Sequence, residues 1–124
     1  MHISDGQIQA PAFKLREGEE SLSVNWLEFL NCPSRESEIA ELRNIYAAKL
    51  TVSARAKIAV LNVGEVRRKV LTESPDGRNL EVLHDPQYTG VYDLSHSGIY
   101  DLKHDDELIA ELILETIRES YPAR

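Results

Sequence analysis

The sequence predicts a single α+β domain that spans residues 1–124. The chain has the length of one domain, and its 42% hydrophobic and 28% charged residues are ordinary for a globular protein. Two segments, about 34–50 and 105–120, have apolar residues at helical spacing, and short apolar segments typical of strands lie outside them. We therefore expect a mixed or antiparallel sheet packed by two main helices.

The first thirty residues favour β structure. Ile8, Ala10 and Ala12 occupy alternating positions, and Pro11 among them is best tolerated at the edge of a sheet. Residues 22–26 alternate apolar and polar side chains, as a half-buried strand does. The charged segment 16–20 between the two stretches predicts a turn. We expect the two stretches to pair as a hairpin across it.

The segment 34–50 has the signals of a helix at both ends. Ser34 can cap its N-terminus, and Glu36 and Glu38 place negative charge in the first turn, where the helix dipole favours it. The apolar positions recur at steps of three and four: Ile39, Leu42, Tyr46 and Leu50. This spacing predicts a helix with one apolar face.

The middle of the chain predicts two strands around a short helix. Residues 58–63 form a nearly continuous apolar run typical of a buried strand. Residues 65–73 fit either a helix or a strand, and their apolar spacing favours the helix. Residues 80–84 predict another strand, which ends at Asp85 because the residue before Pro86 avoids helical geometry. Residues 85–104 are expected to be irregular.

The predicted C-terminal helix is apolar around most of its circumference. Its apolar side chains cover an arc of roughly 240°, whereas a surface helix needs only about 100°. Either the helix packs deeply within its own chain, or a second chain covers part of it. In the second case the interface would contain Leu108, Leu112, Leu114 and Ile117.

A stripe of glutamates occupies the remaining face of this helix. Like charges four residues apart repel one another, and the stripe consists of Glu107, Glu111, Glu115 and Glu119. We expect the basic segment Arg67, Arg68 and Lys69, or a basic partner, to supply the opposite charge.

A short repeat offers candidate metal ligands. The pattern Tyr-Asp-Leu-x-His occurs at residues 92–96 and again at residues 100–104. Carboxylate and imidazole groups are common ligands of zinc, iron and manganese. The predicted ligands of a divalent metal are Asp93, His96, Asp101 and His104. In the alternative interpretation these aspartates are turn residues, and no zinc pattern with known spacing supports a cofactor.

The histidines also allow metal-free acid–base chemistry. Their ordinary pKa lies near neutral pH, so two imidazoles facing each other could act as general acid and base. The candidate catalytic residues are His2, His84 and His96. Arg67 and Arg68 could hold a phosphate group of the substrate.

The net charge and the lengths of the apolar runs argue against some classes of partner and some cellular locations. The formal net charge is -7, and the longest basic run has three residues, which argues against nucleic acid. No apolar run approaches the roughly 18 residues that span a bilayer, and residues 1–6 do not resemble a signal peptide. The single Cys32 fits a reducing compartment. We expect a cytoplasmic protein with no membrane partner.

Several short stretches resemble a type of short bacterial protein to which no activity is attached. They are residues 2–6, 12–13 and 22–26, His84-Asp85-Pro86 and residues 96–99. The resemblance implies a bacterial, cytosolic protein and no particular cofactor or site.

The function expected from the sequence is binding to a protein partner or self-association through the C-terminal helix. The alternative is a His/Asp-based enzyme or metal-binding protein that acts on a phosphate-containing ligand.

Overall fold

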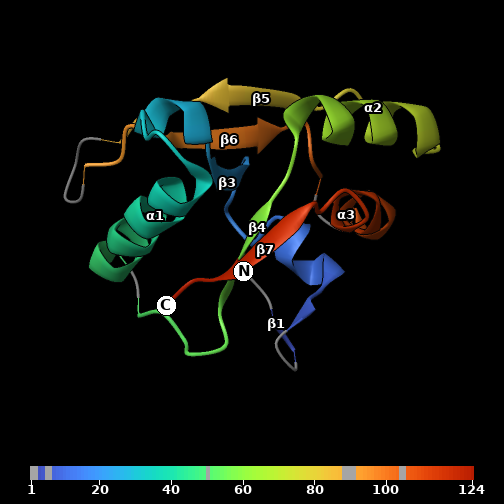
Figure 1. Ribbon diagram of the computed structural model, residues 1–124. Helices are drawn as coiled ribbons and strands as arrows, with labels where there is room; N and C mark the ends of the chain where they lie inside the picture. Colours follow the sequence, from blue (N-terminus) through green and yellow to red (C-terminus); the bar gives the residue numbers. More distant parts are fainter. Residues whose placement is uncertain (1–2, 5–6, 50, 88–91, 104–105) are drawn as a thin grey trace.

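The computed structural model describes residues 3–4, 7–49, 51–87, 92–103 and 106–124, and Figure 1 shows how their helices and strands are arranged. The helices are α1 (Arg35–Lys49), α2 (Val63–Glu73) and α3 (Glu107–Leu114), with two 3₁₀ turns, η1 (Ala10–Phe13) and η2 (Leu27–Leu30). The strands are β1 (Ile3–Ser4), β2 (Gln7–Ile8), β3 (Leu22–Asn25), β4 (Lys57–Val60), β5 (Glu81–His84), β6 (His96–Tyr100) and β7 (Glu119–Pro122).

The strands of the described ranges pair in antiparallel fashion. β6 lies between β3 and β5, β4 pairs with β7, and β1 pairs with β2. Together with the helices, these small sheets confirm the predicted α+β class of a single small domain. In the same ranges, no helix has the length and apolar content that crossing a membrane requires.

The buried apolar side chains form two clusters, which we call the large core and the small core. The large core joins η1, α2, β6 and α3 through Phe13, Val66, Val70, Leu80, Ile99, Leu102, Ile109, Ala110, Leu112 and Ile113. The small core joins α1 to β4 and β7 through Ile39, Leu42, Ile45, Ile58, Val60 and Ala123. In Figure 1, α1 lies on one side of the molecule, and α2 and α3 lie on the other.

Local signals correctly predict the start of α1 and the presence of α2. The hydroxyl of Ser34 accepts a hydrogen bond from the Ser37 N–H at 3.2 Å, as expected of a capping residue. The Asn62 side chain caps α2 in the same way, accepting from the Glu65 N–H at 2.9 Å. The helical interpretation of residues 65–73 is therefore confirmed over the strand.

The predicted hairpin near the N-terminus is wrong. β3 pairs with β6, so that Leu22 lies opposite Ile99 and Asn25 lies opposite His96. Pro11 stands in the first turn of η1, which replaces the expected first strand. Residues 85–104 are likewise not irregular throughout, because β6 lies within them. The sequence of β6 is polar and contains glycine, and its strand geometry comes from pairing with neighbours on both sides.

The C-terminal helix is shorter than the predicted range 105–120. It ends at Leu114, where the Thr116 hydroxyl donates to the Ile113 carbonyl at 2.6 Å. The Arg118 N–H then donates to the Val60 carbonyl at 3.1 Å, and β7 pairs with β4. Thr116 and Ile117 are β-branched and weaken a helix, so pairing with β4 overrides the helical spacing.

We predict that Leu80→Ala lowers the free energy of unfolding by about 3 kcal/mol, because it leaves a cavity in the large core. Leu80 is 0% exposed, whereas Leu83 is 47% exposed. The matched variant Leu83→Ala should change stability by less than about 1 kcal/mol. Urea denaturation of both variants measures the difference, and an equal loss in the two would contradict the assignment of the core.

Candidate functional site

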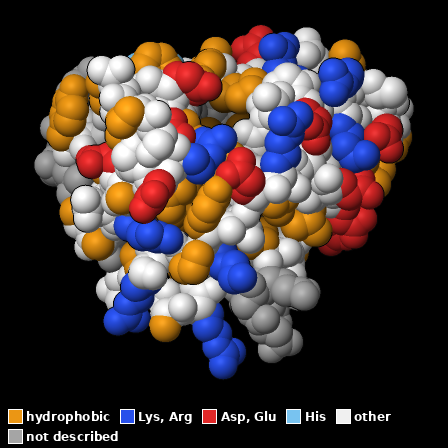
Figure 2. Space-filling model, viewed as in Figure 1, with side chains coloured by type: hydrophobic (Ala, Val, Ile, Leu, Met, Phe, Trp, Pro, Cys, Tyr) orange, Lys and Arg blue, Asp and Glu red, His pale blue; other side chains and the backbone are white. Residues whose placement is uncertain are grey.

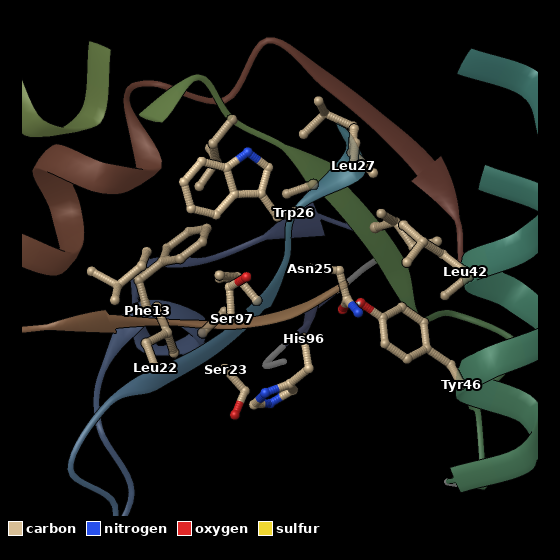
Figure 3. A pocket seen from close by; sticks show the side chains of 18 of the residues that line it. Phe13, Leu22, Ser23, Asn25, Trp26, Leu27, Leu42, Tyr46, His96 and Ser97 are labelled. Carbon is tan, nitrogen blue, oxygen red and sulfur yellow. Dashed lines mark hydrogen bonds between the residues drawn. The ribbon is translucent and has the colours of Figure 1, made fainter. Parts of the chain in front are cut away.

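A groove of about 1100 Å³ lies between the large core and the small core. Side chains from η1, β3, α1, β4 and β6 line it, and Figure 3 shows several of them around the open space. Much of the lining is apolar, including Phe13, Leu22, Val24, Trp26, Leu42, Ile58 and Val60. Polar side chains of β3, β6 and α1 form one end of the groove, which we call the polar end.

Trp26 is the largest side chain of the groove and the single tryptophan of the chain. It directly follows β3, and its backbone N–H donates to the Ser95 carbonyl at 2.8 Å. Its ring packs edge-on against Phe29, with ring centres 5.6 Å apart. In Figure 3 the indole lies between Phe13 and Leu27. The aromatic ring therefore gives the groove a large apolar wall.

The polar end is built on a buried carboxylate. Asp93 is 1% exposed, and its side chain accepts hydrogen bonds from Lys49 at 2.8 Å and from the Ser95 hydroxyl at 2.8 Å. The amide group of Asn25 donates to the same carboxylate at 3.0 Å. The Tyr46 hydroxyl in turn donates to the Asn25 amide oxygen at 2.5 Å. These five side chains, which we call the Asp93 network, join α1 to β3 and to the segment before β6.

Two groups of the Asp93 network have shifted pKa values. Burial alone would raise the pKa of Asp93, but the hydrogen bonds from Lys49, Ser95 and Asn25 and the charge of Lys49 lower it below its ordinary value. Burial, together with the negative charge of Asp93, raises the pKa of Tyr46 to about 12. At neutral pH the network therefore holds a carboxylate paired with an ammonium, beside a neutral phenol.

His96 lies beside this network and lines the groove. It is directly opposite Asn25 in the pairing of β3 with β6, so both side chains point to the same face of the sheet. Its Nδ1 lies 2.9 Å from the backbone oxygen of Asp85. A carbonyl oxygen only accepts, so Nδ1 carries a hydrogen, and the Asp85 carboxylate lies 3.6 Å from the same nitrogen.

The side chains of His84 and His96 do not face each other. It is opposite Ser97 in the pairing of β5 with β6, so its side chain points to the other face of the sheet. Its ring stacks on Phe29 with ring centres 3.6 Å apart, and Nε2 donates to the Leu94 carbonyl at 2.6 Å. The third candidate catalytic residue, His2, lies outside the described residues.

Of the predicted metal ligands, Asp93 and His96 lie close together, and Asp101 lies apart from them. Asp93 is engaged by the Asp93 network, and Asp101 follows the end of β6 that lies away from His96. His104 lies outside the described residues. Within the described ranges, no group of three or more histidine, cysteine, aspartate or glutamate side chains is placed to hold a metal ion.

Arg67 and Arg68 lie on the exposed surface of α2 and do not line the groove. The Arg67 Nε donates to the Leu80 carbonyl at 2.8 Å, which ties this side chain to its own chain. On the face shown in Figure 2, basic and acidic side chains are intermixed and do not gather in one patch.

The apolar circumference of the C-terminal segment is largely covered within the chain. Leu112 is buried, and Leu114 and Ile117 pack against the large core while partly exposed. Leu108 is 46% exposed.

Three glutamates of this segment each lie near a separate cation. As predicted, Lys69 lies near Glu115, with 3.5 Å between the charged groups. Glu107 lies 3.6 Å from Lys14, and Glu119 lies 3.3 Å from Arg35.

Sequence reasoning identified Asp93 and His96 but missed most of their neighbours. Tyr46 was expected on the apolar face of its helix, and Trp26 on a half-buried strand, and neither pattern indicated a site. Lys49 is 44 positions from Asp93 and Asn25 is 68 positions away, so no local spacing could connect them.

We predict that Asp93→Asn lowers the free energy of unfolding at pH 7 by about 3 kcal/mol, because it leaves the Lys49 charge without its partner. A lowered carboxyl pKa contributes stability above the pKa of the unfolded chain, and that stability is lost as pH falls through the folded value. Urea denaturation across the acid range should therefore show a smaller loss of stability in this variant than in the wild type. Asp101→Asn, which removes an exposed carboxylate, should keep the wild-type pH dependence, and an unchanged profile in Asp93→Asn would contradict the assignment.

Comparisons with protein families, with curated proteins and with solved structures find no match to this chain.

Proposed function

We propose that this protein binds a small organic molecule in the groove between its two cores. The observation that carries this proposal is a space of about 1100 Å³ whose lining combines many apolar side chains with the polar groups of the Asp93 network. Ligand sites in proteins are typically concave and apolar, with a few convergent polar groups that orient the ligand. Groups with shifted pKa values also concentrate at such sites, and Asp93 and Tyr46 are of this kind.

The size of the groove supports a small molecule as its occupant. Its volume is slightly above the roughly 300–1,000 Å³ that ligand pockets occupy. Trp26 and Phe13 offer aromatic surface on one side, and Leu42 offers aliphatic surface on the other (Figure 3). Such walls favour a ligand with a compact apolar body.

The phosphate-containing ligand expected from the sequence has less support. Arg67 and Arg68 do not line the groove, and Lys49 at the polar end is paired with Asp93 at 2.8 Å. A phosphate beside His96 would therefore lie near a carboxylate whose charge already balances the nearest cation.

A second proposal is self-association through the C-terminal helix. Leu108 supports it, because this leucine of α3 is 46% exposed, and Leu114 and Ile117 farther along the segment are also partly exposed. Leu112 is buried within the chain, so it is not available as one of the four interface residues that the sequence predicts. We therefore place this proposal behind ligand binding.

We predict that small aromatic molecules bind the groove and shift the indole N–H resonance of Trp26, which is a single signal because the chain has one tryptophan. The probes are toluene, phenol and benzoate, added separately to ¹⁵N-labelled protein. Saturable movement of the indole signal and of groove amides with at least one probe is the expected result. If all three probes leave these signals in place, the proposed function is wrong.

A matched pair of variants locates the binding. Ala59 lines the groove, and Ala48 is exposed on α1. Ala59→Leu should weaken probe binding because its side chain occupies the groove, whereas Ala48→Leu should bind as the wild type does. Circular dichroism of both variants verifies that they fold.

We predict for the second proposal that sedimentation equilibrium detects species heavier than the 14.0 kDa of one chain as concentration rises. Leu108→Lys should return the mass to that of one chain, because it places a charge in the contact. Leu71→Lys, at an exposed leucine of α2, should not change the association. A wild-type protein that keeps the mass of one chain at all concentrations would contradict this proposal.

A further inference from the structure

The groove lies between two strands whose outer edges pair with no other strand of the described ranges. β3 is an edge strand of the three-stranded sheet, and β4 pairs on one side only, with β7. Residues 22–26 and 58–61 line the groove without interruption. Successive side chains of a strand point to opposite faces, so a space that touches all of them lies along the strand edge. The groove therefore runs between the free edges of β3 and β4.

The free edge of β3 carries backbone groups that the described chain leaves unpaired. Alternate residues of a strand direct their N–H and C=O groups to opposite edges. The Trp26 N–H donates to the Ser95 carbonyl, on the β6 side, at 2.8 Å. Ser23 and Asn25 therefore direct their backbone groups away from β6, where no described residue bonds them.

β4 has an edge of the same kind. The Ala56 carbonyl accepts from the Ala123 N–H at 2.9 Å, and the Val60 carbonyl accepts from the Arg118 N–H at 3.1 Å, both on the β7 side. Ala59 therefore directs its N–H and C=O away from β7, and among the described residues these groups have no partner. Exposed strand edges with such groups are templates for an added strand.

The two edges already have the same layers above and below them. Apolar side chains of both strands pack against the large core, namely Leu22, Val24, Ala59 and Leu61. On the opposite face, Asn25 accepts from Tyr46 of α1, and Val60 belongs to the small core that α1 covers. Figure 3 shows Asn25 directed toward Tyr46. A strand placed between β3 and β4 would therefore continue one layer, with the large core on one face and α1 on the other.

The groove is large enough for a short strand. A four-residue strand is about 13 Å long, about 4.8 Å wide and about 10 Å thick with its side chains, so it occupies roughly 600 Å³. The groove holds about 1100 Å³. A compact molecule such as toluene reaches the side chains of one face, whereas an extended peptide reaches those of both.

We propose that the occupant of the groove is a short peptide in extended conformation, which pairs with β3 and β4 and joins the two small sheets into one. This inference rests on the proposed function and names its ligand class. The peptide backbone bonds Ser23 and Asn25 on one side and Ala59 on the other. Its apolar side chains alternate with small polar ones, because alternate positions meet the large core and the polar side chains of β3.

The test uses three peptides with acetyl and amide ends, which carry no terminal charge. The probe is acetyl-Val-Thr-Val-Thr-amide. The first control, acetyl-Val-Val-Thr-Thr-amide, has the same composition without the alternation. The second control is the probe with an N-methyl group on its third residue, which removes one backbone donor. Binding is measured by NMR titration of ¹⁵N-labelled protein, followed at the Trp26 indole and at the backbone amides.

Two variants at one position test the edge of β3. Ser23→Pro removes the N–H that faces the groove, and proline is tolerated at such an edge. Ser23→Ala keeps the N–H and removes only the hydroxyl, so it is the matched control. Circular dichroism verifies that both variants fold.

We expect the probe to bind more tightly than either control peptide, by about three- to tenfold for the loss of one hydrogen bond. Ser23→Pro should weaken probe binding by a similar factor, and Ser23→Ala should bind as the wild type does. At a peptide concentration of about ten times Kd, hydrogen exchange should slow by about tenfold at the amides of Ser23, Asn25 and Ala59. The His84 amide, on the outer edge of β5, should exchange as before.

Several outcomes would overturn the inference. They are equal binding of the probe and its N-methylated form, unchanged exchange at Ser23, Asn25 and Ala59, and slowed exchange at His84 in their place. Binding of toluene, phenol or benzoate without binding of the peptide would also overturn it, and the proposed function would stand. If neither the aromatic probes nor the peptide move the Trp26 indole signal, the proposed function itself is rejected.

Discussion

The arrangement of this protein depends on a buried carboxylate that must be neutralised. Asp93 is almost fully removed from solvent, and an isolated charge in that position would be costly. Its partners come from elements far apart in the chain, with Lys49 on α1, Asn25 on β3 and Ser95 before β6. The carboxylate can therefore be satisfied only when α1 is seated against the three-stranded sheet.

The need to neutralise Asp93 determines the geometry of the fold more than its free energy of unfolding. Burying an ion pair removes two charges from water, and the desolvation cost offsets much of the attraction between them. We infer that the Asp93 network mainly selects the relative position of the two cores, because its members are shared between them. Asn25 belongs to β3 of the sheet that packs against the large core, and Ser95 directly precedes β6 of the same sheet, while Tyr46 packs against the small core. The groove lies where these two bodies of apolar side chains meet.

The same interaction places the groups of the candidate site. Asn25 is held by Asp93 on one side and by Tyr46 on the other, which orients its amide. His96 lies opposite Asn25 in the sheet, and its ring is fixed from the other side by the Asp85 backbone. A network that supports the fold thus also fixes the orientation of Asn25 and Tyr46, two side chains that line the groove.

The sequence by itself determined the elements whose signals are local. Ser34 and the spacing of Ile39 and Leu42 predict α1, the apolar period of residues 65–73 favours α2, and Asp85-Pro86 marks the end of β5. These predictions hold because caps, helical periods and prolines act through neighbours within a few positions.

Tertiary structure decided the rest. β3 pairs with β6 and not with the preceding segment, and residues 119 and 120, which fall in the predicted helix, belong to β7 and pair with β4. The partners of Asp93 and the orientation of His96 were decided in the same way, because they join positions dozens of residues apart. Strand pairing and the neutralisation of a buried charge depend on which distant groups the folded chain brings together, and no local pattern encodes that choice.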